Sequence, residues 1–142
     1  MVLKKKYLVQ VPLFMKQTTK DWLLIAEDDL LAARKLAHEE RLSNLVSFHC
    51  QQCIEKCFKA LIEEKDKPFI KSHDLLRLQQ IADFQLSEEE TILLGMINEV
   101  YIDSRYPGDL GLLPHGKPTT LEIEAFIQLC ENLLNGLKMQ MD

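Results

Sequence analysis

Apolar residues recur every three or four positions along most of this chain, a spacing typical of amphipathic helices. Five segments show it, four of them long, and the connections between them are mostly short. We expect the helices to begin near Thr18, Ser43, Ser72, Ser87 and Thr119. The pattern predicts an all-α protein, an up-and-down four-helix bundle with an additional short helix. The bundle domain is expected over residues 18–142, after an N-terminal arm or extension in residues 1–17.

Short polar residues at the expected helix starts support these boundaries. Ser87 with Glu90, and Thr119 with Glu122, match the capping box, in which each side chain caps a backbone amide of the other residue. The same kind of residue is available to cap the first two helices, Thr18 or Thr19 for one and Ser43 or Asn44 for the other.

The helix expected from Ser43 to about Lys65 has two different sides. Its apolar positions are Cys50, Cys53, Ile54, Cys57, Phe58, Leu61 and Ile62. Polar residues follow the same spacing along the opposite side, namely Gln52, Lys56, Lys59 and Glu63. One side is therefore expected in the core, and the other presents an ordered row of polar groups.

The cysteines of this helix allow two interpretations. Cys50 and Cys53 have the spacing of a redox CxxC motif, and His49 with Cys57 would extend it to a metal cluster. These thiols lie on the apolar side, where free cysteine behaves as a small hydrophobe. A zinc site would need another ligand, and Cys130 is the one remaining cysteine. We interpret the cysteines as packing residues and expect no metal site.

Composition limits the functions that fit this chain. Its 142 residues are enough for one domain with a real core. The net charge of -5 argues against a general nucleic-acid coat protein, although it leaves room for a local basic pocket. No apolar run approaches the roughly 18 residues that cross a bilayer. The N-terminal residues faintly resemble a secretion signal, but Gln10 and Pro12 interrupt the apolar run, so we expect a cytoplasmic protein.

Two short motifs carry residues that bind phosphate or move protons. His73-Asp74 opens a helix, where Asp74 suits a cap and where a histidine beside an acid can also carry a proton. The spacing alone favours the cap. Arg105-Tyr106-Pro107 ends a helix, where Arg105 can satisfy terminal carbonyl groups. Alternatively, Arg105 clamps a phosphate and Tyr106 stacks on a base. The glycine-containing loop that follows lacks the P-loop pattern.

Four motifs occur in order: AxxDLxxA from Ala26, QxxEKxxKAL from Gln52, SHDLxxL from Ser72 and YxxxRYPG from Tyr101. Together they resemble the HEPN family, the higher eukaryote and prokaryote nucleotide-binding domains, over roughly residues 18–137. The resemblance implies an all-α bundle that forms a homodimer, with a polar groove near the dimer seam. Bacterial members are often encoded beside a minimal nucleotidyltransferase, and some such pairs act as toxin and antitoxin. The resemblance therefore points to such a nucleotidyltransferase as the partner.

One feature departs from the ribonuclease members of that family, which carry an arginine followed by four to six residues and then a histidine. The first histidine after Arg105 is His115, with nine residues between them, in a loop that contains Gly111 and Pro114. A helix would hold the shorter spacing on one face, whereas this loop guarantees no such geometry. We therefore favour a binding module over an enzyme.

The hypothesis that follows is a module for a nucleotide or similar phosphate ligand, without a resident cofactor. Lys56, Lys59 and Arg105 would hold phosphate, and Tyr106 would contact the base or ribose. Glu55 would keep a lysine oriented as its ion-pair partner. The candidate ligand-binding residues are Lys56, Lys59, His73, Asp74, Tyr101, Arg105 and Tyr106.

Two alternatives belong to other classes of protein. The first is a metal-independent ribonuclease toxin, in which Arg105 stabilises the phosphate transition state and His73 or His115 moves protons. The second is a structural adaptor that docks a partner through the bundle surface. In that case the polar row of the second helix is simply a solvated face.

Overall fold

The computed structural model describes residues 15–103 and 116–141. These residues form five α-helices and one 3-10 turn: α2 (Gln17–Leu36), η1 (Glu40–Leu42), α3 (Ser43–Glu64), α4 (Leu75–Ala82), α5 (Glu88–Asp103) and α6 (Thr120–Met141). The prediction of an all-α bundle of four long helices with a short additional one is confirmed.

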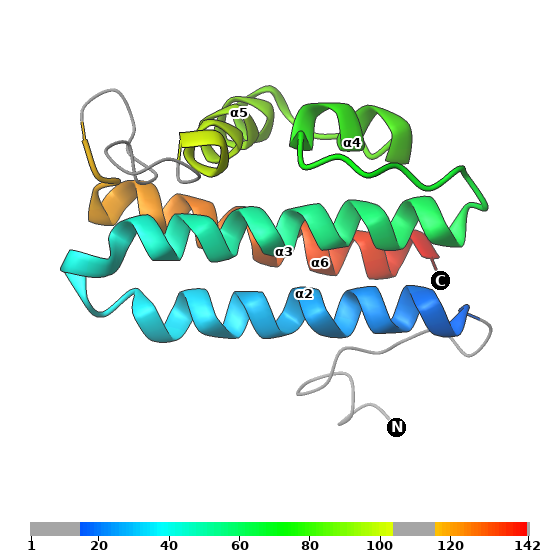
Figure 1. Cartoon of the computed structure of the whole chain (residues 1–142), viewed down its shortest axis with the longest axis horizontal. Coiled ribbons are helices and arrows are strands. Elements are labelled where there is room, and N and C mark those ends of the chain that lie inside the picture. Colours follow the sequence, from blue (N-terminus) through cyan, green and yellow to red (C-terminus); the bar gives the residue numbers. More distant parts are fainter. Residues whose placement is uncertain (1–14, 104–115, 142) are drawn as a thin grey trace.

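Helix α3 is the centre of the bundle. It packs against all four other helices, with α2 along one side, α4 and α5 across the other, and α6 behind it in the view of Figure 1. Its core positions interleave with those of α6, where Phe58 and Phe126 are the largest fully buried side chains. Because α3 is enclosed on so many sides, some of its polar residues are buried as well, including Gln51, Glu55 and Lys59.

Side-chain caps explain where three of the helices begin. The two predicted capping boxes are confirmed: Glu90 N donates to Ser87 Oγ over 3.1 Å, and Glu122 N donates to Thr119 Oγ1 over 3.2 Å. The short helix α4 is capped by Asp74, whose carboxylate accepts from the amide of Leu76 over 3.1 Å. The capping interpretation of Asp74 is therefore confirmed as well.

The predicted caps of the first two helices are wrong. Lys16 and Leu42 occupy the N-cap positions of α2 and α3, and neither makes a side-chain cap hydrogen bond. The hydroxyls of Thr18 and Thr19 instead donate to the carboxylates of Glu63 and Glu64 at the far end of α3, over 2.8 Å and 2.9 Å. At the other end, α3 continues directly from η1, and the amide of Ser43 bonds the Glu40 carbonyl. For α2, contacts with α3 therefore occupy the hydroxyls that the local sequence offers as caps.

The four cysteines are all buried free thiols. Cys50, Cys53 and Cys57 lie in the core between α3 and its neighbours, and Cys130 Sγ of α6 lies 3.5 Å from the Cys50 carbonyl oxygen. Burial, together with hydrogen bonds to Cys50 and Cys53, raises the pKa of Cys130 well above its ordinary value. The interpretation of these cysteines as packing residues is confirmed by their full burial.

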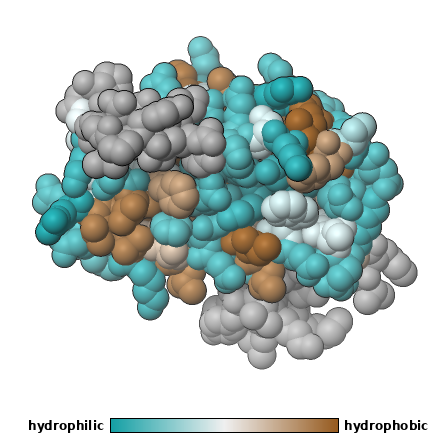
Figure 2. Space-filling model, in the orientation of Figure 1, coloured by the Kyte–Doolittle hydropathy of each residue, from teal (hydrophilic) through white to brown (hydrophobic). Residues whose placement is uncertain are grey.

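The face of the molecule seen in Figure 2 is mainly hydrophilic. Figure 2 shows apolar side chains on it as separate small patches rather than as one continuous face. Within residues 15–103 and 116–141, no helix is both long and apolar enough to span a bilayer.

Candidate functional site

A buried carboxylate joins α3 to the segment that precedes α4. After α3 ends, residues 65–74 turn back over it (Figure 1). His73 in this segment contacts Glu55, which lies near the middle of α3. Glu55 Oε1 lies 3.0 Å from His73 Nδ1, and Glu55 Oε2 accepts from Lys59 Nζ over 2.7 Å. Gln51 Nε2 also donates to Glu55 Oε1 over 3.1 Å. One carboxylate thus holds three donors, and we call these four residues the Glu55 cluster.

The Glu55 cluster is buried at its base and open at one edge. Glu55 and Lys59 are only 4% and 8% exposed, whereas the His73 side chain is 48% exposed. Burial acts to raise the pKa of Glu55, but the hydrogen bonds from Lys59, His73 and Gln51 outweigh it, so the pKa lies below its ordinary value. Glu55 is therefore ionised at neutral pH, and it fixes the orientation of a half-exposed imidazole.

The lowered pKa of Glu55 leads to a prediction about stability and pH. Ionised Glu55 stabilises the fold fully above its ordinary pKa of 4.5, and this contribution is lost as the pH falls through the lower pKa of the folded protein. We expect the free energy of unfolding to decline below that pH, and to decline less steeply in Glu55→Gln. Urea unfolding at a series of pH values measures this. Equal slopes in the two proteins would contradict the prediction.

The start of α4 is fixed by a second polar group on α5. Asn98 Nδ2 donates to Asp74 Oδ1 over 3.1 Å, and Asn98 Oδ1 accepts from the amide of Leu75 over 2.9 Å. Asp74 is therefore occupied by its own helix and by α5. His73 and Asp74 are adjacent in the sequence but make different contacts. Asp74 caps α4 and accepts from Asn98, and His73 contacts Glu55.

Lys56 belongs to a separate polar group between α3 and α2. Its Nζ donates to Asp29 Oδ2 over 2.6 Å, and Asp29 Oδ1 lies 3.0 Å from His49 Nδ1. The structure therefore brings Lys59 and His73 together and directs Lys56 toward α2. The predicted ion-pair role of Glu55 is confirmed through Lys59. Each of the two lysines proposed to hold phosphate is already paired with a carboxylate.

The remaining predicted site residues come from the end of α5 and the segment after it. Tyr101 belongs to α5, but its side chain lies outside the part of the chain that the structure describes, as do Arg105, Tyr106 and His115. The predicted approach of Arg105 to α3 stays a prediction.

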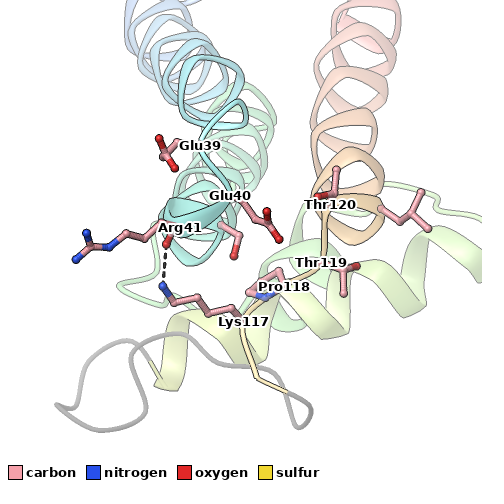
Figure 3. A pocket seen from close by; sticks show the side chains of 9 residues that line it. Glu39, Glu40, Arg41, Lys117, Pro118, Thr119 and Thr120 are labelled. Carbon is pink, nitrogen blue, oxygen red and sulfur yellow. Dashed lines mark hydrogen bonds between the residues drawn. The ribbon is translucent and has the colours of Figure 1, made fainter.

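A hollow of about 790 Å³ lies at the N-terminal end of α3, where η1 faces the start of α6 (Figure 3). Lys117 Nζ crosses it to donate to the Arg41 carbonyl over 2.7 Å. The wall of the hollow consists of Glu39, Glu40, Arg41, Ser43, Lys117, Pro118, Thr119, Thr120 and Leu121. None of the predicted site residues whose side chains the structure describes is among them, and the acidic and basic side chains of these nine residues balance, so the Glu55 cluster is the better candidate site.

A model of the HEPN domain matches residues 19–140. The chain belongs to the HEPN family. Two solved structures share the HEPN fold with it: TT1696 from Thermus thermophilus, with 23% identity and a TM-score of 0.70 over 88% of this chain and 99% of that one, and ST0689, an archaeal HEPN homologue, with 24% identity and a TM-score of 0.68 over 89% and 100%. No curated protein matches the chain.

In this HEPN domain, ion pairs connect three of the four motifs that led to the family. Asp29 of the first motif pairs with Lys56 of the second, and Glu55 of the second pairs with His73 of the third. The motif residues are therefore held together between α2, α3 and the segment before α4.

Two residues of the site were missed by the reasoning from sequence. Gln51 stands four positions before Glu55, and this spacing could have placed both on one face of α3. Asn98 gave no comparable signal, because its partners, Asp74 and the amide of Leu75, lie more than twenty positions away in the sequence.

Proposed function

We propose that this HEPN domain binds a nucleotide or a similar phosphate ligand at the open edge of the Glu55 cluster. The observation that carries the proposal is the contact between buried Glu55 and half-exposed His73. An imidazole held at Nδ1 by a carboxylate is oriented in advance, and this favours hydrogen bonding to a phosphate.

The charge of the segment that carries His73 supports an anionic ligand. The chain carries a net charge of -5, yet residues 65–77 contain four lysine or arginine residues and only two acidic ones. Lys65 and Lys67 donate to the main-chain carbonyls of Ala82 and Ile81, which are uncharged, so their positive charges are not cancelled by a carboxylate there. A local basic surface on an acidic protein attracts phosphate.

Some residues of this site contact the ligand, and others hold those residues in place. His73 and exposed Lys71 contact the phosphate, and Arg105, as the sequence indicates, adds a bidentate donor. Lys59 and Glu55 form the buried support that orients His73. Lys56 stabilises the α2–α3 contact through Asp29.

Calorimetric titration with a panel of ribonucleotides tests the proposal. We expect the wild-type protein to bind at least one of them, and His73→Asn to bind it about tenfold more weakly or worse, because a hydrogen bond to a charged group is lost. His38→Asn is the matched control, because His38 is exposed beyond the end of α2 and is expected to leave the affinity unchanged. Absence of binding at millimolar nucleotide by folded wild-type protein would end the proposal.

The contact between His73 and Glu55 also favours one second candidate, metal-independent RNA cleavage. A histidine held by a carboxylate suits proton transfer at a phosphate ester, and Arg105 would stabilise the transition state. This activity predicts growth arrest on expression and RNA decay in vitro, both abolished by Arg105→Ala and by His73→Asn. Intact RNA after incubation with purified protein, together with harmless expression, would exclude it.

We also propose that the domain acts as a homodimer and serves a minimal nucleotidyltransferase partner in a toxin–antitoxin-like pair. Family membership supports this assembly. Light scattering on the purified protein tests the dimer. Co-expression with a nucleotidyltransferase encoded beside the gene, followed by co-purification, tests the partnership. A monomer that fails to retain that protein would contradict the proposal.

A further inference from the structure

An exposed phenylalanine stands in the basic segment beside the Glu55 cluster. Phe69 is 57% exposed, and it is the one aromatic residue among the large apolar side chains that the described parts of the chain leave exposed. It lies four residues before His73 and two before Lys71, in a segment without regular secondary structure. A single exposed apolar side chain is normal on a protein surface, so what distinguishes Phe69 is its place beside the Glu55 cluster.

The ring of Phe69 covers the buried amine of Lys59. Lys59 Nζ lies 5.9 Å from the centre of the Phe69 ring and 5.7 Å from the centre of the Trp22 ring. At these distances both rings make cation–π interactions with Lys59, the lysine that pairs with Glu55. The Phe69 ring thus rests on the Glu55 cluster and still leaves more than half of the residue open to solvent.

We infer that Phe69 is the base-stacking residue of this site, and that it takes the purine or pyrimidine ring of a nucleotide whose phosphate lies toward Lys71 and His73. The inference rests on the proposed function and adds to it the part of the ligand that the segment before α4 recognises. An aromatic ring between cationic side chains is the arrangement by which proteins bind unpaired bases without reading their sequence. Recognition is therefore expected for several bases and weak for phosphate compounds that lack a base.

Two alternatives predict different results: Phe69 only shields Lys59, or Tyr106 alone stacks on the base. If Phe69 only shields Lys59, its removal changes the stability of the fold and leaves the preference for a base untouched. If Tyr106 alone stacks on the base, as its place beside Arg105 in the sequence indicates, Tyr106→Leu weakens nucleotide binding and Phe69→Leu does not.

The experiment compares a 2-aminopurine nucleotide, whose emission falls when its base stacks on an aromatic ring, with ribose 5-phosphate, which has no base. We expect emission to fall on binding to the wild-type protein. Phe69→Leu should weaken nucleotide binding about 5- to 150-fold, the loss typical of one stacked base, and leave ribose 5-phosphate within about twofold. Phe69→Tyr should bind like the wild type. Leu76→Ala, which removes an exposed apolar side chain of α4, is the matched control.

Each outcome decides between the proposals. If wild-type protein binds no nucleotide, the proposed function and this inference fall together. If it binds nucleotides and Phe69→Leu binds them equally well, the inference alone is overturned and the proposed function stands. Emission of Trp22, the single tryptophan of the chain, shows in the same titrations that the surroundings of Lys59 are intact in each variant.

Discussion

Glu55→Gln is expected to lower the free energy of unfolding by about 3–5 kcal/mol, the usual effect of breaking a buried ion pair by removing one partner. The substitution keeps the size of the side chain but leaves the amine of Lys59 buried without its carboxylate, since Lys59 is only 8% exposed. It also replaces the carboxylate that holds His73 by a neutral amide, which offers one acceptor oxygen to the donors of Gln51, Lys59 and His73. Urea unfolding at neutral pH, followed by circular dichroism, measures the change.

Two further variants show whether the unpaired charge is the cause. Glu55→Gln combined with Lys59→Met removes both charges, and we expect the double variant to recover much of the lost stability, because a hydrophobic substitute for a buried pair is often neutral. Glu124→Gln changes an exposed glutamate on α6 and is expected to stay within about 0.5 kcal/mol of the wild type. A loss below about 1 kcal/mol for Glu55→Gln would mean that water solvates Lys59 in the folded protein.

The fold could be predicted from the sequence because its signals are local. Helical periodicity is set by residues three and four positions apart, and the capping boxes of α5 and α6 each fit within four residues. The caps predicted for α2 were wrong for the opposite reason. The hydroxyls of Thr18 and Thr19 bond carboxylates 45 positions away, and no local pattern reveals such a partner.

The candidate site could be predicted only in part. The motifs supplied Lys59, Glu55 and His73, but their spacing did not show that one carboxylate would hold both cationic side chains. The spacing of the polar row along α3 predicts a single surface. In the structure Lys56 faces α2 and Lys59 lies beneath the segment before α4, because the central helix of a bundle is covered on several sides. Phe69 was missed because an apolar residue in a loop carries no periodic signal.

Phe58→Ala should destabilise the protein by about 3–5 kcal/mol, as expected for truncating a fully buried aromatic residue. Phe58 lies in the C-terminal third of α3 with no exposed surface, and its ring centre is 6.4 Å from that of Phe84, which follows α4. Truncation therefore leaves a cavity next to the connection between α4 and α5. Phe58→Leu should cost less, because it preserves more of the packed volume. Ile92→Ala, on the exposed side of α5, is the control.

The cavity left by Phe58→Ala should also loosen the candidate site. The carbonyl of Phe84 accepts from Gln79 Nε2 of α4 over 2.6 Å. The other end of α4 is capped by Asp74, which follows His73 directly and accepts from Asn98 of α5. Hydrogen exchange should therefore rise more in α4 than in α2, because local opening is easiest where packed contacts are lost. Equal increases in the two helices would show that α4 unfolds only together with the whole bundle, and that Phe58 supports the bundle as a single cooperative unit.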